Sequence, residues 1–273
     1  MDYLRRPLER LTGCDTRRKT ARARLKAAKN ADREQYLALV DDYIDLAQTY
    51  LHGSATESSE QRIATMTRLF TGIWQNLPYA ERLSDVEYML SQALIASAPA
   101  ASSAPSPDAR LGKLRQLPPQ ARFALLAYHS LNWSIHWLTL ALRIKAPALH
   151  QLLCQARCEI CAVSWDSLAV EEQDCLVAIS ATLEQSPNLQ TNQALHQKSQ
   201  AYPRIMRIKA QWLELRPELV ELRLRNSLSP SARQHLLANL RRSTRAHAMQ
   251  QPALVDRIIN SVQFSRHDAI QVG

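Results

Sequence analysis

Four cysteines lie close together in the middle of the chain, at Cys154, Cys158, Cys161 and Cys175. Thiolates at these spacings could hold zinc or an iron–sulfur cluster. Spacings of four and seven residues also put the first three sulfurs on one face of a helix, and a free cysteine is among the most buried residue types. Core cysteines are therefore the favoured interpretation. A metal or thiol-sensing site and an iron–sulfur enzyme remain as alternatives.

Two further groups of residues could do chemistry, and each has a structural explanation. His129 and His136 are seven residues apart on helical segments, but no carboxylate accompanies them, so we expect core or boundary side chains. Asp41, Asp42 and Asp45 lie on the polar side of an amphipathic segment, which favours a solvated face over an acidic catalytic group. No nucleophile elbow, phosphate loop or two-metal pattern occurs. We therefore expect no enzyme and no cofactor.

The composition favours an all-α protein of more than one domain. The 273 residues are 46% hydrophobic, which is enough for real cores, and contain only 5 glycines, too few for a Gly-rich phosphate loop or a turn-dense β-sandwich. No apolar run approaches the ~18 residues that span a bilayer, and the N-terminus has no apolar signal region. An odd count of 5 cysteines without an export signal favours reduced thiols and a cytoplasmic location without membrane contact.

Charge is distributed in blocks along the chain. The total is 34 Lys and Arg against 25 Asp and Glu, a formal net charge of +9. Residues 1–33 hold 11 basic and 4 acidic side chains, residues 34–110 hold 4 and 10, and residues 201–247 hold 10 and 3. The basic blocks could neutralise the phosphates of a nucleic acid. A loose arm and solvated helix faces are the alternative explanation.

Apolar residues at spacings of three and four predict helices along most of the chain. We expect one helix over residues 34–51, a second over 63–77 that stops at Pro78, and a third over 86–94. Residues 96–108 contain Ala, Ser and Pro almost exclusively, so they predict a flexible linker. The predicted organisation is a basic arm (1–33), an N-terminal helical domain (34–95), a linker (96–110), a helix-turn-helix domain (111–163) and a helical C-terminal extension (164–273).

The C-terminal extension contains signals for the start and the end of helices. Ser229 followed by Pro230 predicts a helix start, because serine caps helices and proline fits the first turn. Prolines also predict four helix stops, at Pro187, Pro203, Pro217 and Pro252.

The segment after the linker predicts two short helices joined by a tight turn. Ser134 can cap the first of them, the turn falls at Arg143–Lys145, and Pro147 fits the first turn of the second. This arrangement is a helix-turn-helix, whose second helix shows polar side chains to the major groove of DNA.

These residues resemble a known family. Residues 117–160 look like the C-terminal helix-turn-helix domain of bacterial RNA polymerase sigma factors of the extracytoplasmic-function type. The positions that match this domain are Leu117-Pro118-Pro119, Arg122, Leu125-Leu126, Ser134, Leu138, Leu142, Ile144, Leu149, Leu153, Ala156 and Arg157.

The N-terminal half and the order of the domains extend this resemblance. Residues 34–95 resemble the N-terminal helical domain of the same family, through the segment from Leu69 to Leu77. The resemblance implies that core RNA polymerase and promoter double-stranded DNA are partners, and that an anti-sigma or other regulatory protein could bind.

The resemblance implies roles for two sets of residues. The helix over residues 146–158 would enter the major groove. DNA contacts would come from Arg143, Lys145, His150, Gln151, Gln155 and Arg157. Polymerase contacts would come from Leu69, Phe70, Ile73 and Trp74.

The chain departs from the family pattern in both halves. Residues 64–68 lack the carboxylates that the family has there, and His150, Gln151 and Leu152 replace its usual Lys and Arg. A degenerate sigma-like interaction protein without promoter recognition is therefore the alternative.

Overall fold

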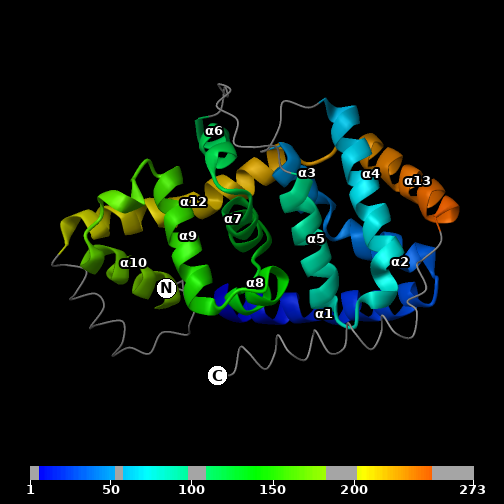
Figure 1. Cartoon of the computed structure of the whole chain (residues 1–273), viewed down its shortest axis with the longest axis horizontal. Helices are drawn as coiled ribbons and strands as arrows, with labels where there is room; N and C mark the ends of the chain where they lie inside the picture. The colour runs from blue at the N-terminus through cyan, green and yellow to red at the C-terminus, as the bar shows by residue number, and fades with distance from the viewer. Residues whose placement is uncertain (1–5, 53–57, 98–108, 183–201, 248–273) are drawn as a thin grey trace. The chain divides into compact units, whose positions relative to one another are not determined.

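The computed structural model describes residues 6–52, 58–97, 109–182 and 202–247, and these are helices joined by turns, without a strand (Figure 1). The prediction of an all-α fold is confirmed. No helix among the described residues is long and apolar enough to cross a membrane. Residues 98–108 of the predicted linker lie outside the described part. The helices are α1 (Arg6–Lys29), α2 (Arg33–Asp41), α3 (Ile44–His52), α4 (Ser59–Asn76), η1 (Leu77–Tyr79), α5 (Leu83–Ser97), α6 (Ala109–Gln116), α7 (Pro119–Leu131), α8 (Ile135–Leu142), α9 (Ala146–Ile160), η2 (Trp165–Ser167), α10 (Val170–Thr182), α12 (Pro203–Arg225) and α13 (Pro230–Ala246).

The chain divides into two compact units that interleave in sequence. The first unit takes residues 1–44, 63–90 and 229–273, and the second takes residues 45–62 and 91–228. Helix α13 therefore belongs to the same unit as α1, α2 and most of α4.

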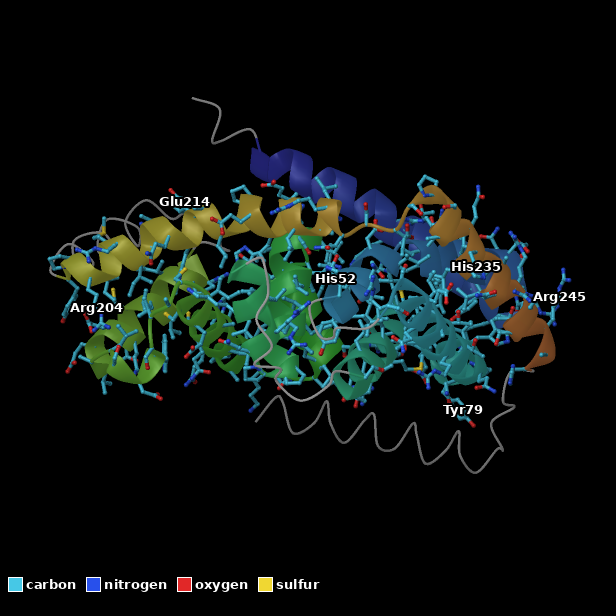
Figure 2. The ribbon with its side chains drawn as sticks, turned by 90° about the horizontal axis from the view of Figure 1, so that it is seen from above. His52, Tyr79, Arg204, Glu214, His235 and Arg245 are labelled. Atoms are coloured by element: carbon cyan, nitrogen blue, oxygen red, sulfur yellow. The ribbon has the colours of Figure 1, made fainter. Side chains whose placement is uncertain are left out.

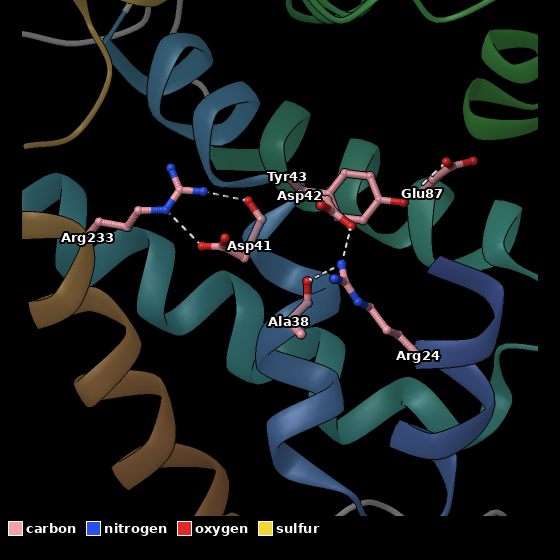
Figure 3. Close-up of polar contacts among 7 residues, drawn as sticks. All are labelled: Arg24, Ala38, Asp41, Asp42, Tyr43, Glu87 and Arg233. Carbon is pink, nitrogen blue, oxygen red and sulfur yellow. Dashed lines mark hydrogen bonds and ion pairs between the residues drawn. The ribbon is translucent and has the colours of Figure 1, made fainter. Parts of the chain in front are cut away.

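The core of the first unit forms where α2 meets α4. The rings of Tyr36 and Trp74 lie 5.0 Å apart between centroids, and the Tyr36 hydroxyl donates to the carbonyl oxygen of Phe70. Helix α1 packs against α2. Arg24 fixes it there by donating to the Ala38 carbonyl at 2.9 Å and to the Asp42 carboxylate at 2.8 Å (Figure 3). The apolar stripe of α2 thus provides one face of a helical core.

A break between α2 and α3 corrects the expectation of one helix over residues 34–51. The backbone N–H of Tyr43 bonds to the Val40 carbonyl at 2.8 Å, which closes a turn. The Tyr43 hydroxyl contacts the buried Glu87 carboxylate at 3.3 Å (Figure 3), and Arg18 donates two hydrogen bonds to that carboxylate, each 2.9 Å. The tertiary contact with Glu87 explains why the chain leaves the helix at this point.

The second unit is built on α7, which packs against α8, α9 and α12. Arg122 at its first turn is 1% exposed. Its guanidinium donates to the carbonyls of Leu114, Arg115 and Leu117 at 3.0, 2.7 and 3.1 Å, so it fixes the turn from α6 into α7. Asn132 ends α7 in the left-handed conformation, with φ 58°.

Helix α12 corrects one of the predicted stops, because Pro217 lies inside it. Pro203 starts the helix, whereas Pro187 and Pro252 lie outside the described residues. The helix continues past Pro217 because its buried positions keep the helical spacing on both sides, and packing against α7 and α9 outweighs the lost backbone bond. The buried positions are Ile205, Ile208, Trp212, Leu215, Leu219 and Leu222.

The position of the exposed Pro217 inside α12 leads to a prediction about stability. We expect Pro217→Ala to raise the free energy of unfolding by about 2 kcal/mol. A proline inside a helix destabilises the folded state by ~3 kcal/mol relative to alanine, and part of this loss is offset because proline also lowers the conformational entropy of the unfolded chain. Urea unfolding at an unchanged m-value measures the gain. Pro230→Ala is the matched control, since Pro230 occupies the first turn of α13 and has no helical bond to lose. Equal shifts for the two variants would contradict this account.

Candidate nucleic-acid interface

Helices α8 and α9 are joined by a tight turn. The Ser134 hydroxyl caps α8 by accepting the N–H of Trp137 at 3.2 Å. Arg143 ends that helix in the left-handed conformation, with φ 53°, and the N–H of Ile144 returns to the Thr139 carbonyl at 3.2 Å. This local geometry makes the chain change direction between the two helices.

Helix α9 exposes its beginning and buries most of the rest. Lys145 is the N-cap residue, and Pro147 lies in the first turn. Beyond this turn α9 packs against α6, α7, α8, α10 and α12, so only a narrow stripe stays in contact with solvent. The exposed residues from Lys145 onward are Lys145, Ala146, Pro147, Ala148, Gln151 and Glu159.

Four of the predicted DNA-contacting residues reach solvent at this edge. Lys145 and Gln151 are exposed, whereas Arg143 and Gln155 are half-buried. Gln151 and Gln155 are one helical turn apart, so they share the stripe. Glutamine amides can hydrogen-bond base edges, and the N-terminus of a helix attracts anions. The edge therefore offers amide groups for bases and a positive end for phosphate.

The other two predicted DNA contacts lie in the interior. His150 is 9% exposed, and its Nδ1 lies 3.2 Å from the Ser180 hydroxyl of α10. Burial and, secondly, the Arg157 guanidinium lower the pKa of His150. In this conformation His150 is buried where α9 meets α10.

Arg157 is the more unusual case, because it is 2% exposed and its contacts are with neutral groups. Its Nε donates to His129 Nε2 at 3.1 Å, and a terminal nitrogen donates to the Ser180 hydroxyl at 2.8 Å. The guanidinium carbon lies 5.0 Å from the ring centroid of Tyr128 and 5.2 Å from that of Trp212. Burial lowers the pKa of Arg157. A side chain held in this way organises the core of the second unit.

The predicted polymerase-contacting residues are also interior. Leu69, Phe70, Ile73 and Trp74 are at most 7% exposed. The Trp74 indole N–H donates to the carbonyl of His247, just after α13, at 3.0 Å. These side chains hold the first unit together, so any contact that they make with a partner requires the unit to open.

The cysteines gather in the core of the second unit. Cys154, Cys158 and Cys175 are fully buried, and Cys161 packs against the same cluster. Burial raises the pKa of the Cys154 thiol to about 11 and that of Cys158 to about 12, which disfavours the thiolate that binds metals. Among the described residues, no three His, Cys, Asp or Glu side chains are arranged to hold a metal ion. The arrangement favours core cysteines.

The structure also brings together residues that sequence patterns do not connect. Arg233 of α13 contacts the Asp41 carboxylate at 2.8 Å (Figure 3), and Arg241 makes two hydrogen bonds to Glu34, of 2.9 and 2.8 Å. Each pair is separated by about two hundred residues. The one signal in the sequence was the opposite charge of blocks 34–110 and 201–247.

No family model matches the sequence, and no curated protein or solved structure is significantly similar to it. Function therefore has to be argued from the chemistry of these surfaces.

The burial of His150 predicts a pH dependence of stability. Its pKa in the folded chain lies below the ordinary 6.5, so folding favours the neutral ring. This contribution is present above pH 6.5 and is lost as the pH falls below it, because the unfolded chain binds the proton more readily. We expect the free energy of unfolding to fall between pH 7 and pH 5.5, and His150→Gln to reduce that slope in urea titrations.

The control for this prediction is His136→Gln, which changes an exposed histidine on α8. It should leave the slope of the wild-type chain unchanged. If both substitutions alter the slope equally, the pH dependence does not come from the buried ring.

Proposed function

We propose that the chain is a sigma-like transcription protein that binds core RNA polymerase and recognises promoter DNA through a helix-turn-helix. The observation that carries the proposal is the tight left-handed turn at Arg143, which is followed by an exposed first turn of α9. Proteins of the helix-turn-helix class contact base edges with the N-terminal residues of the second helix. The exposed part of α9 is the part that this mode of binding uses.

The proposed contacts divide by chemistry. Gln151 and Gln155 supply amides that can pair with adenine edges in the major groove. Lys145 and the N-terminal dipole of α9 supply attraction for a phosphate that lies beside the groove. Arg143, half-buried on the turn, would supply a charge for a second phosphate. His150 and Arg157 support the helix from inside.

A second candidate function is a sigma-like interaction protein that binds a partner without reading a promoter. A specific observation favours it: α10 and α12 pack on α9, and the exposed stripe ends in Glu159, which repels phosphate. Helix α8 also exposes 42% of Leu140, an apolar side chain better matched to a protein than to a DNA backbone.

Transcription reconstituted with core polymerase on a promoter library tests the proposal. We expect Gln151→Ala to relax base preference at one or two positions by about 1–3 kcal/mol, because it removes a base-reading amide. We expect Lys145→Ala to weaken all promoters alike and to lower the slope of log affinity against log salt by about 1. Gln211→Ala, an exposed glutamine on α12, is the matched control.

The same assay separates the two candidates. A chain that binds core polymerase but leaves promoter choice unchanged is the interaction protein. A chain that binds neither core polymerase nor promoter DNA contradicts the sigma-like proposal.

A further inference from the structure

Helix α13 packs on the rest of the first unit through a short stripe of buried side chains. Leu236, Leu240 and Thr244 follow one another at spacings of four residues, and each is 0% exposed. The helix packs against α2. Its other face is exposed, as at His235 and Arg245 (Figure 2). Helix α13 thus buries one narrow face.

Charged contacts flank this stripe and lie near solvent. In the Arg233–Asp41 pair the side chains are 30% and 42% exposed, and in the Arg241–Glu34 pair they are 48% and 63% exposed. Arg33 of α2 donates to the Thr244 carbonyl at 3.2 Å. Ion pairs this exposed contribute little to stability and compete with water and salt. The two ion pairs join basic residues of α13 to carboxylates of α2, but they hold α13 only weakly.

The end of α13 meets the segment through which the resemblance places polymerase binding. The Thr71 and Ser243 hydroxyl oxygens lie 2.9 Å apart, and the Trp74 indole N–H donates to the His247 carbonyl. The ring contact between Tyr36 and Trp74 joins α2 and α4 directly, without α13. The α2–α4 pair therefore keeps part of its own core if α13 leaves.

We infer that α13 is a displaceable cover of the polymerase-docking face that α2 and α4 form. The inference rests on the proposed function and concerns the regulation of that same surface. While α13 is seated, a partner cannot reach the surface near Thr71 and Trp74. A basic amphipathic helix is the partner that suits this surface, because it matches Glu34 and Asp41 in charge and its apolar side chains fill the sites of Leu236 and Leu240.

Three forms of the full-length chain test this inference. The opened form carries Arg233→Glu and Arg241→Glu, which turn both ion pairs into repulsions. The matched control carries Arg242→Glu, because Arg242 is exposed on the same helix and, among the described residues, donates to Asn239 of that helix. The locked form carries Thr71→Cys and Ser243→Cys, because the two hydroxyl oxygens lie 2.9 Å apart and cysteine sulfurs at these positions would lie close together.

Hydrogen exchange of α13 amides and affinity for core polymerase are measured on each form. We expect the opened form to exchange at least tenfold faster in α13 and to bind polymerase at least tenfold more tightly than the Arg242→Glu control. The oxidised locked form should bind at least tenfold more weakly than its reduced form. Adding Glu34→Arg and Asp41→Arg to the opened form restores both pairs and should return exchange and affinity to the wild-type values.

The contrary outcomes are distinct. If the opened form exchanges faster but binds polymerase no more tightly than the control, α13 does not cover the docking face, although the proposed function stands. Unchanged exchange in the opened form also overturns the inference, because the introduced repulsions then do not loosen the helix. If the opened form does not fold, the locked form decides, and equal binding when oxidised and reduced overturns the inference. Absence of polymerase binding in every form removes the proposed function and this inference with it.

Discussion

The burial of the Arg157 guanidinium is the constraint on which the second unit depends. A buried cation is costly unless other groups compensate it, and here two hydrogen bonds and two aromatic faces do so. The compensating groups come from α7, α10 and α12, so those helices must stay in place around α9. Helix α9 is consequently a core element along most of its length, and only its first turn and one stripe can meet a partner.

The first unit buries a group of the opposite charge, the Glu87 carboxylate. Arg18 of α1 supplies the compensating charge, and the Tyr43 hydroxyl contacts the carboxylate from the turn that follows α2. Basic α13 likewise pairs with carboxylates of α2. Part of the positive charge of the basic blocks is therefore neutralised by carboxylates of the same chain. Net charge alone is for this reason weak support for nucleic-acid binding.

Local features of the fold could be predicted from the sequence, and features that depend on distant partners could not. The caps at Ser134 and Ser229 involve residues three positions away, so their residue types suffice. The break before Tyr43 and the continuation through Pro217 depend on Glu87 and on the packing of α12. The sequence pattern is the same for an arginine that faces a DNA groove and for one that lies in a core. The burial of Arg157 therefore could not be predicted without knowing that Ser180 and Trp212 lie beside it.

The C-terminal extension has a packing role that its sequence did not indicate. The resemblance to sigma factors ends near residue 160, and it assigns outward contacts to α4 in one unit and to α9 in the other. In each unit, elements beyond that point pack on these helices: α13 on the α2–α4 pair, and α10 and α12 on α9. Apolar positions such as Leu215 and Leu240 are fully or almost fully buried in that packing. Because α13 packs in one unit and α10 and α12 pack in the other, a change that loosens the extension removes core contacts from both units, even where no predicted contact residue is touched.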